Sequence, residues 1–349
     1  MSANIEGCHL VGSVPLSDTE AVFRACVQGL PSRLKRIPDG ETGDRHYFTL
    51  CQYYLFKAAP VMMVDFSDNQ EAGAKQFTEE QIKEGVEQLK KANIETGYDT
   101  AAIESYAVFT KLREEGVIPP GVKFQVGLPT IASVIGPFVE KAFQPKAAPI
   151  YEAALFRAMR KIQDKIPHED LSIQLDLAVD TAYWEGEYLT PWFENTKGTV
   201  MDYLLRMINE IDQDVELGVH NCYGDMEHKH WFEPTSMKAV VERGSLLFDR
   251  SSHPIKFFHA PVPVSVMDNL DFYLEPLKDL VPKLEQYNAE LYLGVVQYDD
   301  LEGTKKRIEA ASKVVPRFGI ATECGWGRTP ADQIEDIMSI SSELSKPLV

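Results

Sequence analysis

The residues that could do chemistry are a histidine and two cysteines at the ends of apolar, strand-like runs. His220 and Cys222 lie two residues apart after the run 215–219, and Cys324 follows the run 319–322. Residues two apart on a strand point to the same face, so His220 and Cys222 can bind one ion. Thiolate and imidazole are donors that zinc prefers, at about 2.0–2.3 Å. The pattern predicts a zinc site, and the alternative is a buried cysteine pair beside a histidine bonded to a backbone carbonyl.

A fourth donor, His259, follows the run 255–258 and completes a His/Cys/His/Cys set in this prediction. His228 and His230 also lie two residues apart, in the segment GDMEHKHWF. This segment is acidic and aromatic, which is more typical of a lid or a solvated turn. We therefore expect neither of them to be a metal ligand, and we find no constellation around His9.

The elements that must position these residues alternate regularly along the chain. Eight β-branched runs are each followed by a segment of helical period, which predicts a (β/α)8 barrel of the α/β class. The alternative is an open, doubly wound sheet, but the chain has no G-x-G-x-x-G after its first run and no G-x-x-x-x-G-K-[ST]. The expected strands are 9–12, 34–38, 122–126, 172–175, 215–219, 255–258, 291–296 and 319–322.

We expect one domain over residues 1–349, because no Pro/Gly/Ser-rich linker divides the chain. The longest insertion, about 47–121, lies between the second and third strands. It contains the acidic, amphipathic segment TEEQIKEGVEQLKKA. Such an insertion usually covers one end of a barrel or forms the interface of a homo-oligomer.

In a barrel of this kind the reacting groups lie at the carboxyl ends of the strands. Polar residues gather at these ends, among them Ser13, Glu41, Asp176 and Asp299. Turns also favour such residue types, so a purely structural explanation stays open for each aspartate. Aromatic residues near the strand ends indicate an apolar substrate chamber, or else ordinary packing: Trp184, Trp231, Tyr298 and Trp326.

The composition narrows the class of partner. Lys and Arg total 35 against 53 for Asp and Glu, and the formal charge is −18. This balance argues against nucleic acid and against an anionic membrane surface as partners. The N-terminal segment has no basic region followed by an apolar run, and no run of about 18 apolar residues occurs. The five cysteines are odd in number and scattered, so we expect free thiols and a cytoplasmic protein.

Five short motifs together resemble the C-terminal catalytic barrel of cobalamin-independent methionine synthase. They are GSVPL, DGETGDRHYF, HNCYGD, VVQYDD and ATECGWGR, in the same order and at similar spacing over about residues 7–330. The resemblance implies a zinc ion that holds a thiol as thiolate while a methyl group is transferred. It places His220, Cys222 and Cys324 on three metal ligands, and it places His259 where the family has a glutamate.

The same resemblance implies roles for other strand-end residues. Ser13, Glu41 and Asp176 match positions that bind the polar groups of the thiol substrate. Glu41 and Asp299 are expected to be catalytic, and Asp299 would assist proton transfer or else hold a metal ligand in position. Arg328 lies near a basic position of the family. The net charge makes a polyanionic folate tail an unattractive donor.

Three functions remain open at this point. The first is a zinc-dependent transferase that moves a methyl or other alkyl group to or from a thiol, with a small-molecule thiol and an alkyl donor as partners. The second is a hydrolase or lyase that uses metal-activated water or a metal-activated carbonyl on the same barrel. The third is a non-catalytic, metal-binding descendant.

Overall fold

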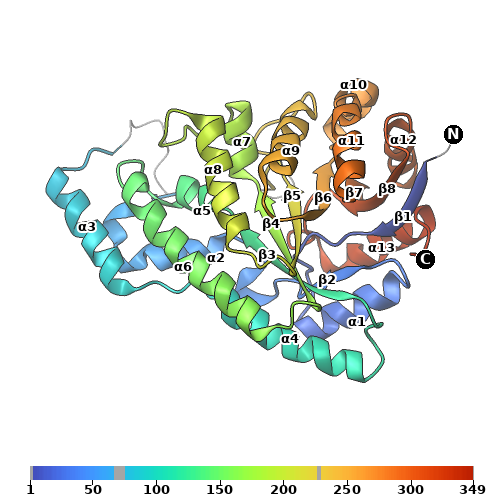
Figure 1. Cartoon of the computed structure of the whole chain (residues 1–349), viewed down its shortest axis with the longest axis horizontal. Coiled ribbons are helices and arrows are strands. Elements are labelled where there is room, and N and C mark those ends of the chain that lie inside the picture. Colours follow the sequence, from blue (N-terminus) through green and yellow to red (C-terminus); the bar gives the residue numbers. More distant parts are fainter. Residues whose placement is uncertain (1–2, 67–74, 226–228, 349) are drawn as a thin grey trace.

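The computed structural model describes residues 3–66, 75–225 and 229–348, and within them the chain forms an eight-stranded parallel sheet (Figure 1). The sheet order is β1-β8-β7-β6-β5-β4-β3-β2. The strands are β1 (Asn4–Cys8), β2 (Arg36–Pro38), β3 (Lys123–Pro129), β4 (Leu171–Leu177), β5 (Glu216–Asn221), β6 (Ile255–Pro261), β7 (Glu290–Val296) and β8 (Arg317–Thr322).

The two edges of this sheet meet, so the sheet curls into a barrel. Cys8 at the end of β1 forms a parallel bridge with Leu34, just before β2, and its N–H donates to the carbonyl of Arg33 at 2.8 Å. The predicted (β/α)8 barrel is confirmed. The first strand was expected at 9–12, but β1 ends at Cys8. A register shift between Ile5 and Cys8, with Gly7 at φ +74°, breaks the alternation by which that strand could be recognised.

Helices connect the strands as the pattern predicts. Many begin at a capping side chain: the carboxylate of Asp18 accepts from the N–H of Ala21, and Asp300 accepts from Gly303. The helices outside the insertion are α1 (Thr19–Gly29), α5 (Ile131–Phe138), α6 (Gln144–Lys165), α7 (Val179–Glu185), α8 (Thr196–Asn209), α9 (Lys238–Arg250), α10 (Leu270–Leu274), α11 (Leu277–Tyr287), α12 (Leu301–Ser312) and α13 (Ile334–Leu344).

The insertion between β2 and β3 is helical, as expected. It holds α2 (Leu50–Tyr53), α3 (Glu79–Ala92) and α4 (Tyr98–Glu114), while its residues 67–74 lie outside the described part of the chain. Thr78 and Gln81 form a reciprocal capping box at the start of α3. The segment that leads into α3 packs against the segment that leads into α6 through the rings of Phe77 and Phe143, whose centroids are 4.8 Å apart. α3 lies at the opposite end of the molecule from α12 (Figure 1).

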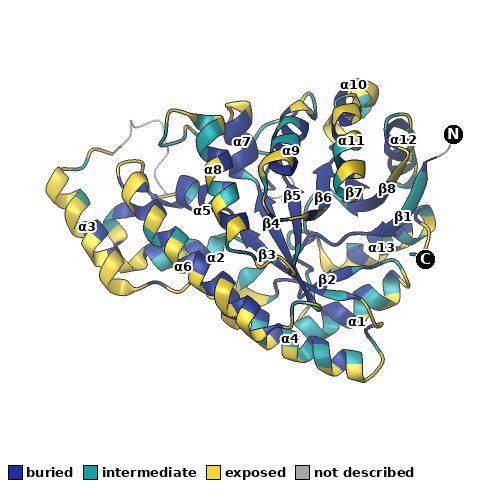
Figure 2. Ribbon diagram, viewed as in Figure 1, coloured by how far each residue is buried: buried dark blue, intermediate teal, exposed yellow. Residues whose placement is uncertain are grey.

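The burial pattern explains how these elements hold together. The strands other than β1 are buried along most of their length, β1 is half-buried at its start, and each long helix has one buried and one exposed face (Figure 2). Such a pattern is what strands covered by helices require.

Among the described residues, no helix is both long enough and apolar enough to cross a membrane.

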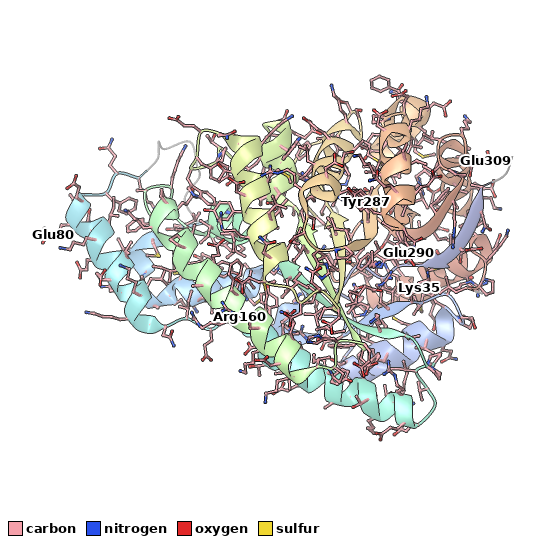
Figure 3. All side chains as sticks on the ribbon, in the orientation of Figure 1. Lys35, Glu80, Arg160, Tyr287, Glu290 and Glu309 are labelled. Carbon is pink, nitrogen blue, oxygen red and sulfur yellow. The ribbon has the colours of Figure 1, made fainter. Side chains whose placement is uncertain are left out.

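The amino-terminal end of the barrel is closed by a buried arginine. Arg36 is 3% exposed, donates to Glu216 at 2.8 Å and to Glu290 at 3.2 Å, and stacks 4.1 Å from the ring of Phe257. A Cβ at Gly218 would lie 2.0 Å from that ring, so only glycine leaves room for it. Lys35 also pairs with Glu290 on this side, beside the strand starts (Figure 3). The opposite end of the barrel is left for the candidate site.

Candidate metal centre

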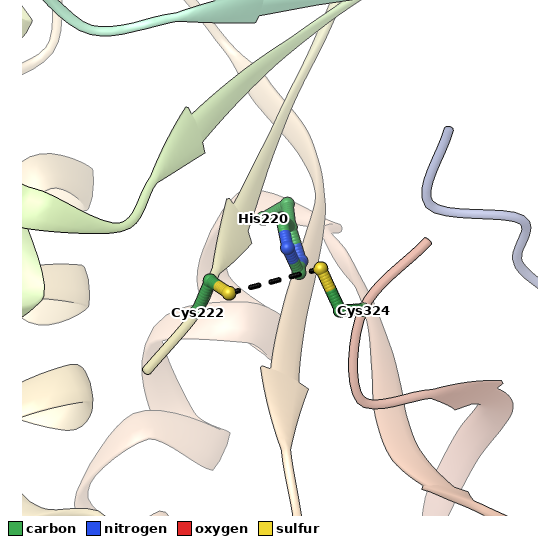
Figure 4. Close-up of side chains that lie close together, drawn as sticks. All are labelled: His220, Cys222 and Cys324. Carbon is green, nitrogen blue, oxygen red and sulfur yellow. Dashed lines mark hydrogen bonds between the residues drawn. The ribbon is translucent and has the colours of Figure 1, made fainter. Parts of the chain in front are cut away.

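Three of the four predicted metal ligands meet at the carboxyl end of the barrel (Figure 4). His220 is near the end of β5, Cys222 follows this strand directly, and Cys324 lies two residues beyond β8. One ligand atom from each residue lies within 4.8 Å of the other two. The loop that carries Cys324 is held by the hydroxyl of Thr322, which donates to the Cys324 carbonyl at 2.7 Å.

The spacing of the donor atoms fits a tetrahedral ion. The two Sγ atoms are 3.8 Å apart. Two sulfur atoms that bind one tetrahedral ion at about 2.3 Å lie about 3.8 Å from each other. Two thiolates and one imidazole suit a borderline-soft metal ion, and three protein ligands leave a fourth position open, as in catalytic zinc sites.

His259 does not join the group, although it pairs with His220 in the β5–β6 register. Its Nε2 lies 3.0 Å from the carbonyl oxygen of Thr322, which can only accept, so Nε2 carries the proton. The bare Nδ1 of neutral His259 then accepts from the Nδ1–H of His220 at 2.7 Å. These two hydrogen bonds leave Nε2 of His220 with a lone pair that can bind a metal ion. His259 therefore orients the ligand His220 and is not itself positioned as a ligand.

Burial keeps both imidazoles neutral. It lowers the pKa of His259 to about 4, and it also lowers the pKa of His220, with a further contribution from the neighbouring His259. A neutral imidazole is the form that can donate an electron pair to a metal ion.

The two cysteines differ in acidity. The Cys222 thiol donates to Cys324, which lowers the pKa of Cys324 and raises that of Cys222. The guanidinium of Arg328 lies 3.4 Å from the Cys324 sulfur and favours its thiolate. Arg328 is itself held by Asp225, at 2.5 and 3.1 Å. The first thiolate of the pair therefore forms at Cys324.

A cavity of about 100 Å³, which we call the inner chamber, lies on one side of the cysteines and is bordered by Ser13, Glu41, Phe48, Asp176, His220 and Cys324. Glu41 and Asp176 are 7% exposed. Both carboxylates face Gly127, where a Cβ would lie 3.3 Å from Glu41 Oε1 and 3.8 Å from Asp176 Oδ2. Burial, and then the nearby Asp39, raises the pKa of Glu41 to about 8. Burial and Glu41 likewise raise the pKa of Asp176.

A larger cavity of about 420 Å³, the outer chamber, shares Cys222 and Cys324 with the inner chamber and is also bordered by His230, Glu233, Tyr298, Glu323 and Trp326, among others. His230 bridges two carboxylates, with Nε2 3.1 Å from Glu323 and Nδ1 3.2 Å from Glu233. Although burial works against it, the contact with Glu323 raises the pKa of His230 to about 9. Gln297 donates to the second oxygen of Glu323 at 2.6 Å.

The predicted substrate-binding residues divide between these cavities. Ser13, Glu41 and Asp176 border the inner chamber, whereas Tyr298 and Trp326 border the outer one. Asp299, predicted as catalytic, borders neither: it is exposed, and its N–H donates to Asp336 of α13 at 2.8 Å.

The sequence analysis expected His230 in a lid or a solvated turn and not as a metal ligand, and it did not foresee that His230 borders the outer chamber. The sequence does show His230 three residues before the acidic Glu233. The other partner of His230, Glu323, is 93 residues away along the chain and cannot be recognised from local spacing. His228 lies outside the described residues. His9, dismissed with the isolated histidines, is buried, bonds Gln174 at 2.8 Å and lies 5.9 Å from His259 between ring centroids.

Comparison with known proteins does not assign the chain. No family model matches it, and no curated protein matches its sequence. Its structure is similar to that of a provisionally assigned alpha-L-fucosidase from Bacteroides thetaiotaomicron VPI-5482, with 11% sequence identity and a TM-score of 0.34, over 99% of this chain and 98% of that one. A likeness this low supports no conclusion about activity, so the function is argued from the site alone.

Proposed function

We propose that the protein is a zinc-dependent transferase that moves a methyl or other alkyl group to or from a thiol. The observation that carries this proposal is the position of His220, Cys222 and Cys324. They form a three-ligand set in which Cys222 and Cys324 border both cavities and His220 borders the inner one, so an open fourth position could be approached from either cavity. A bound zinc ion would supply thiolate activation, because coordination removes the thiol proton near neutral pH.

The residues that border the inner chamber favour one class of thiol substrate. Glu41 and Asp176 are both buried and near each other, and the charge of Glu41 raises the cost of ionising Asp176. An ammonium group would relieve that cost by pairing with both carboxylates. Ser13 hydrogen-bonds Glu41 and so orients its carboxyl group. We therefore propose a small aminothiol as the substrate that the inner chamber holds.

The resemblance to cobalamin-independent methionine synthase supports the same reaction. The motif residues His220, Cys222 and Cys324 are the three that the structure gathers, and the expected substrate residues Ser13 and Glu41 border the adjoining cavity.

Cobalt substitution tests the proposal directly. The cobalt-loaded protein should bind about one metal ion per chain, and its thiolate-to-cobalt charge-transfer absorption should increase when cysteamine is added. 2-Mercaptoethanol, which lacks the ammonium group, should produce the same increase only at a higher concentration. Cys222→Ser should lose most of the metal, whereas Cys51→Ser is the matched control because Cys51 borders neither chamber.

Two results would contradict the proposal. A metal content well under one ion per chain that does not change in Cys222→Ser would show that these residues do not form a metal centre. If the protein binds a full complement of cobalt but its spectrum does not respond to either thiol, a thiol is not the substrate. That result would favour the hydrolase or lyase function.

A further inference from the structure

We propose that the outer chamber binds the alkyl donor, and that this donor is a small cation with a methylated onium centre, a quaternary ammonium or a sulfonium. This inference rests on the proposed function, since it names the second substrate of the same site. It assigns a binding role to His230, Glu233 and Glu323, none of which is predicted above as a binding residue.

The position of the outer chamber makes it suitable for a donor. Cys222 and Cys324 border both chambers. A thiol held from the inner side and a methyl group presented from the outer side would therefore meet at the cysteine pair. The outer chamber, at about 420 Å³, is also the larger of the two and has the range of size typical of small-molecule sites.

The charges that border the outer chamber favour a cation. Asp225 is paired with Arg328, so that pair is neutral. Among the other described residues at the chamber, Glu233 and Glu323 contribute two negative charges against the one positive charge of protonated His230, so these three side chains together carry a net negative charge. Among the described residues that border this chamber, none is Lys or Arg. Within the described part of the chain, the cation that a polyanionic donor would find at this chamber is His230, which two carboxylates already hold.

Two aromatic side chains at the outer chamber also favour a methylated cation. Trp326 and Tyr298 border the same cavity, Trp326 buried at 5% exposure and Tyr298 at the more open side with 46% exposure. The indole N–H of Trp326 is bonded to Thr322 at 2.8 Å, so its ring is held in place. Rings of this kind attract a methylated onium group, whose positive charge is spread over its methyl hydrogens.

The transfer balances without a further reactant. The thiolate sulfur attacks a methyl carbon, the new S–C bond forms, and the bond from that carbon to nitrogen or sulfur breaks. The electron pair of the broken bond stays on the leaving atom, which departs as a neutral amine or sulfide. The proton of the thiol passes to solvent when the thiolate forms, and the leaving group needs none.

Binding of two isosteric probes tests the charge requirement. Choline and 3,3-dimethylbutan-1-ol have nearly the same shape and differ in the charged nitrogen. Titration calorimetry with the full chain, metal-free, should show choline binding at least about tenfold more tightly. Glu233→Gln should reduce choline affinity by about tenfold and leave the alcohol unaffected. Glu309→Gln is the matched control, because Glu309 is exposed on the outside of α12 (Figure 3).

Glu323→Gln should have the same effect as Glu233→Gln, and circular dichroism would show whether each variant is folded. Equal affinity for the two probes, or choline binding unchanged in a folded Glu233→Gln protein, would overturn the inference. Tighter binding of the anion folate than of choline would overturn it too. None of these measurements depends on metal or thiol. Choline binding without a thiol response would thus refute the proposed function, and a thiol response without choline binding would refute only the donor.

Discussion

Replacement of Glu41 by glutamine should change how the stability of the protein depends on pH. Glu41 has an ordinary pKa of 4.5 and about 8 in the fold, where burial and Asp39 disfavour its charge. Between these values the folded protein holds a proton that the unfolded chain has lost. The free energy of unfolding contributed by this proton is fully present below pH 4.5, and it is lost as the pH rises through 8.

The size of the effect follows from the two pKa values. A tenfold change in ionisation constant corresponds to about 1.4 kcal/mol, so the interval from 4.5 to about 8 is worth about 5 kcal/mol. We expect about 3–5 kcal/mol to be lost by the wild-type protein between pH 5 and pH 9. The amide introduced by Glu41→Gln cannot ionise, so most of this loss should disappear in that variant. A smaller slope should remain, because burial also raises the pKa of Asp176.

Urea unfolding of the metal-free protein, followed by fluorescence at several pH values, measures this loss. Glu309→Gln serves as the control, since Glu309 is an exposed carboxylate remote from the inner chamber. Equal losses in the wild-type protein and in Glu41→Gln would refute the reasoning, because they would mean that Glu41 ionises in the folded protein as it does in water.

Three further predictions concern the metal centre and the barrel. Cys222→Ser should lower the zinc content, measured by atomic emission, from about one ion per chain to well under one; an unchanged content would remove Cys222 as a ligand. His259→Ala should weaken zinc binding about 10–100-fold while a full ion still binds at saturation, because the Nδ1 partner of His220 is lost. A complete loss of binding would instead make His259 a ligand. Arg36→Ala should lower the free energy of unfolding by about 3–5 kcal/mol, since Glu216 would lose its buried partner; a loss below about 1 kcal/mol in urea unfolding would contradict this.

The architecture was predictable because each buried strand and each amphipathic helix has its own short-range pattern of apolar and polar residues in the sequence. The pattern failed where a segment has no such alternation. α5 and α7 are examples, because nearly every residue in them is buried and they show no polar face. Asp299 was misplaced for a different reason: the end of β7 was located well, but a strand end does not say whether a side chain three residues beyond it faces the barrel axis or solvent.

The candidate site was predictable to the extent that it depends on strand parity. His220 and Cys222 share a face because of their spacing, and the last strand brings Cys324 to the same end. The role of His259 could not be predicted, because it depends on which nitrogen holds a proton, and that is set by the carbonyl of Thr322. His230 could not be predicted either, since a distant carboxylate draws it inward.

The separation of Cys222 and Cys324 in the sequence has a consequence for how the protein matures. The two sulfur atoms lie 3.8 Å apart, yet 102 residues separate them. During synthesis at about 5–20 residues per second, the second sulfur emerges about 5–20 s after the first. Until then His220 and Cys222 offer only two donors, too few for the ligand set described above. Acquisition of the proposed metal ion would thereby be a late step, one that waits for the eighth strand to close the barrel.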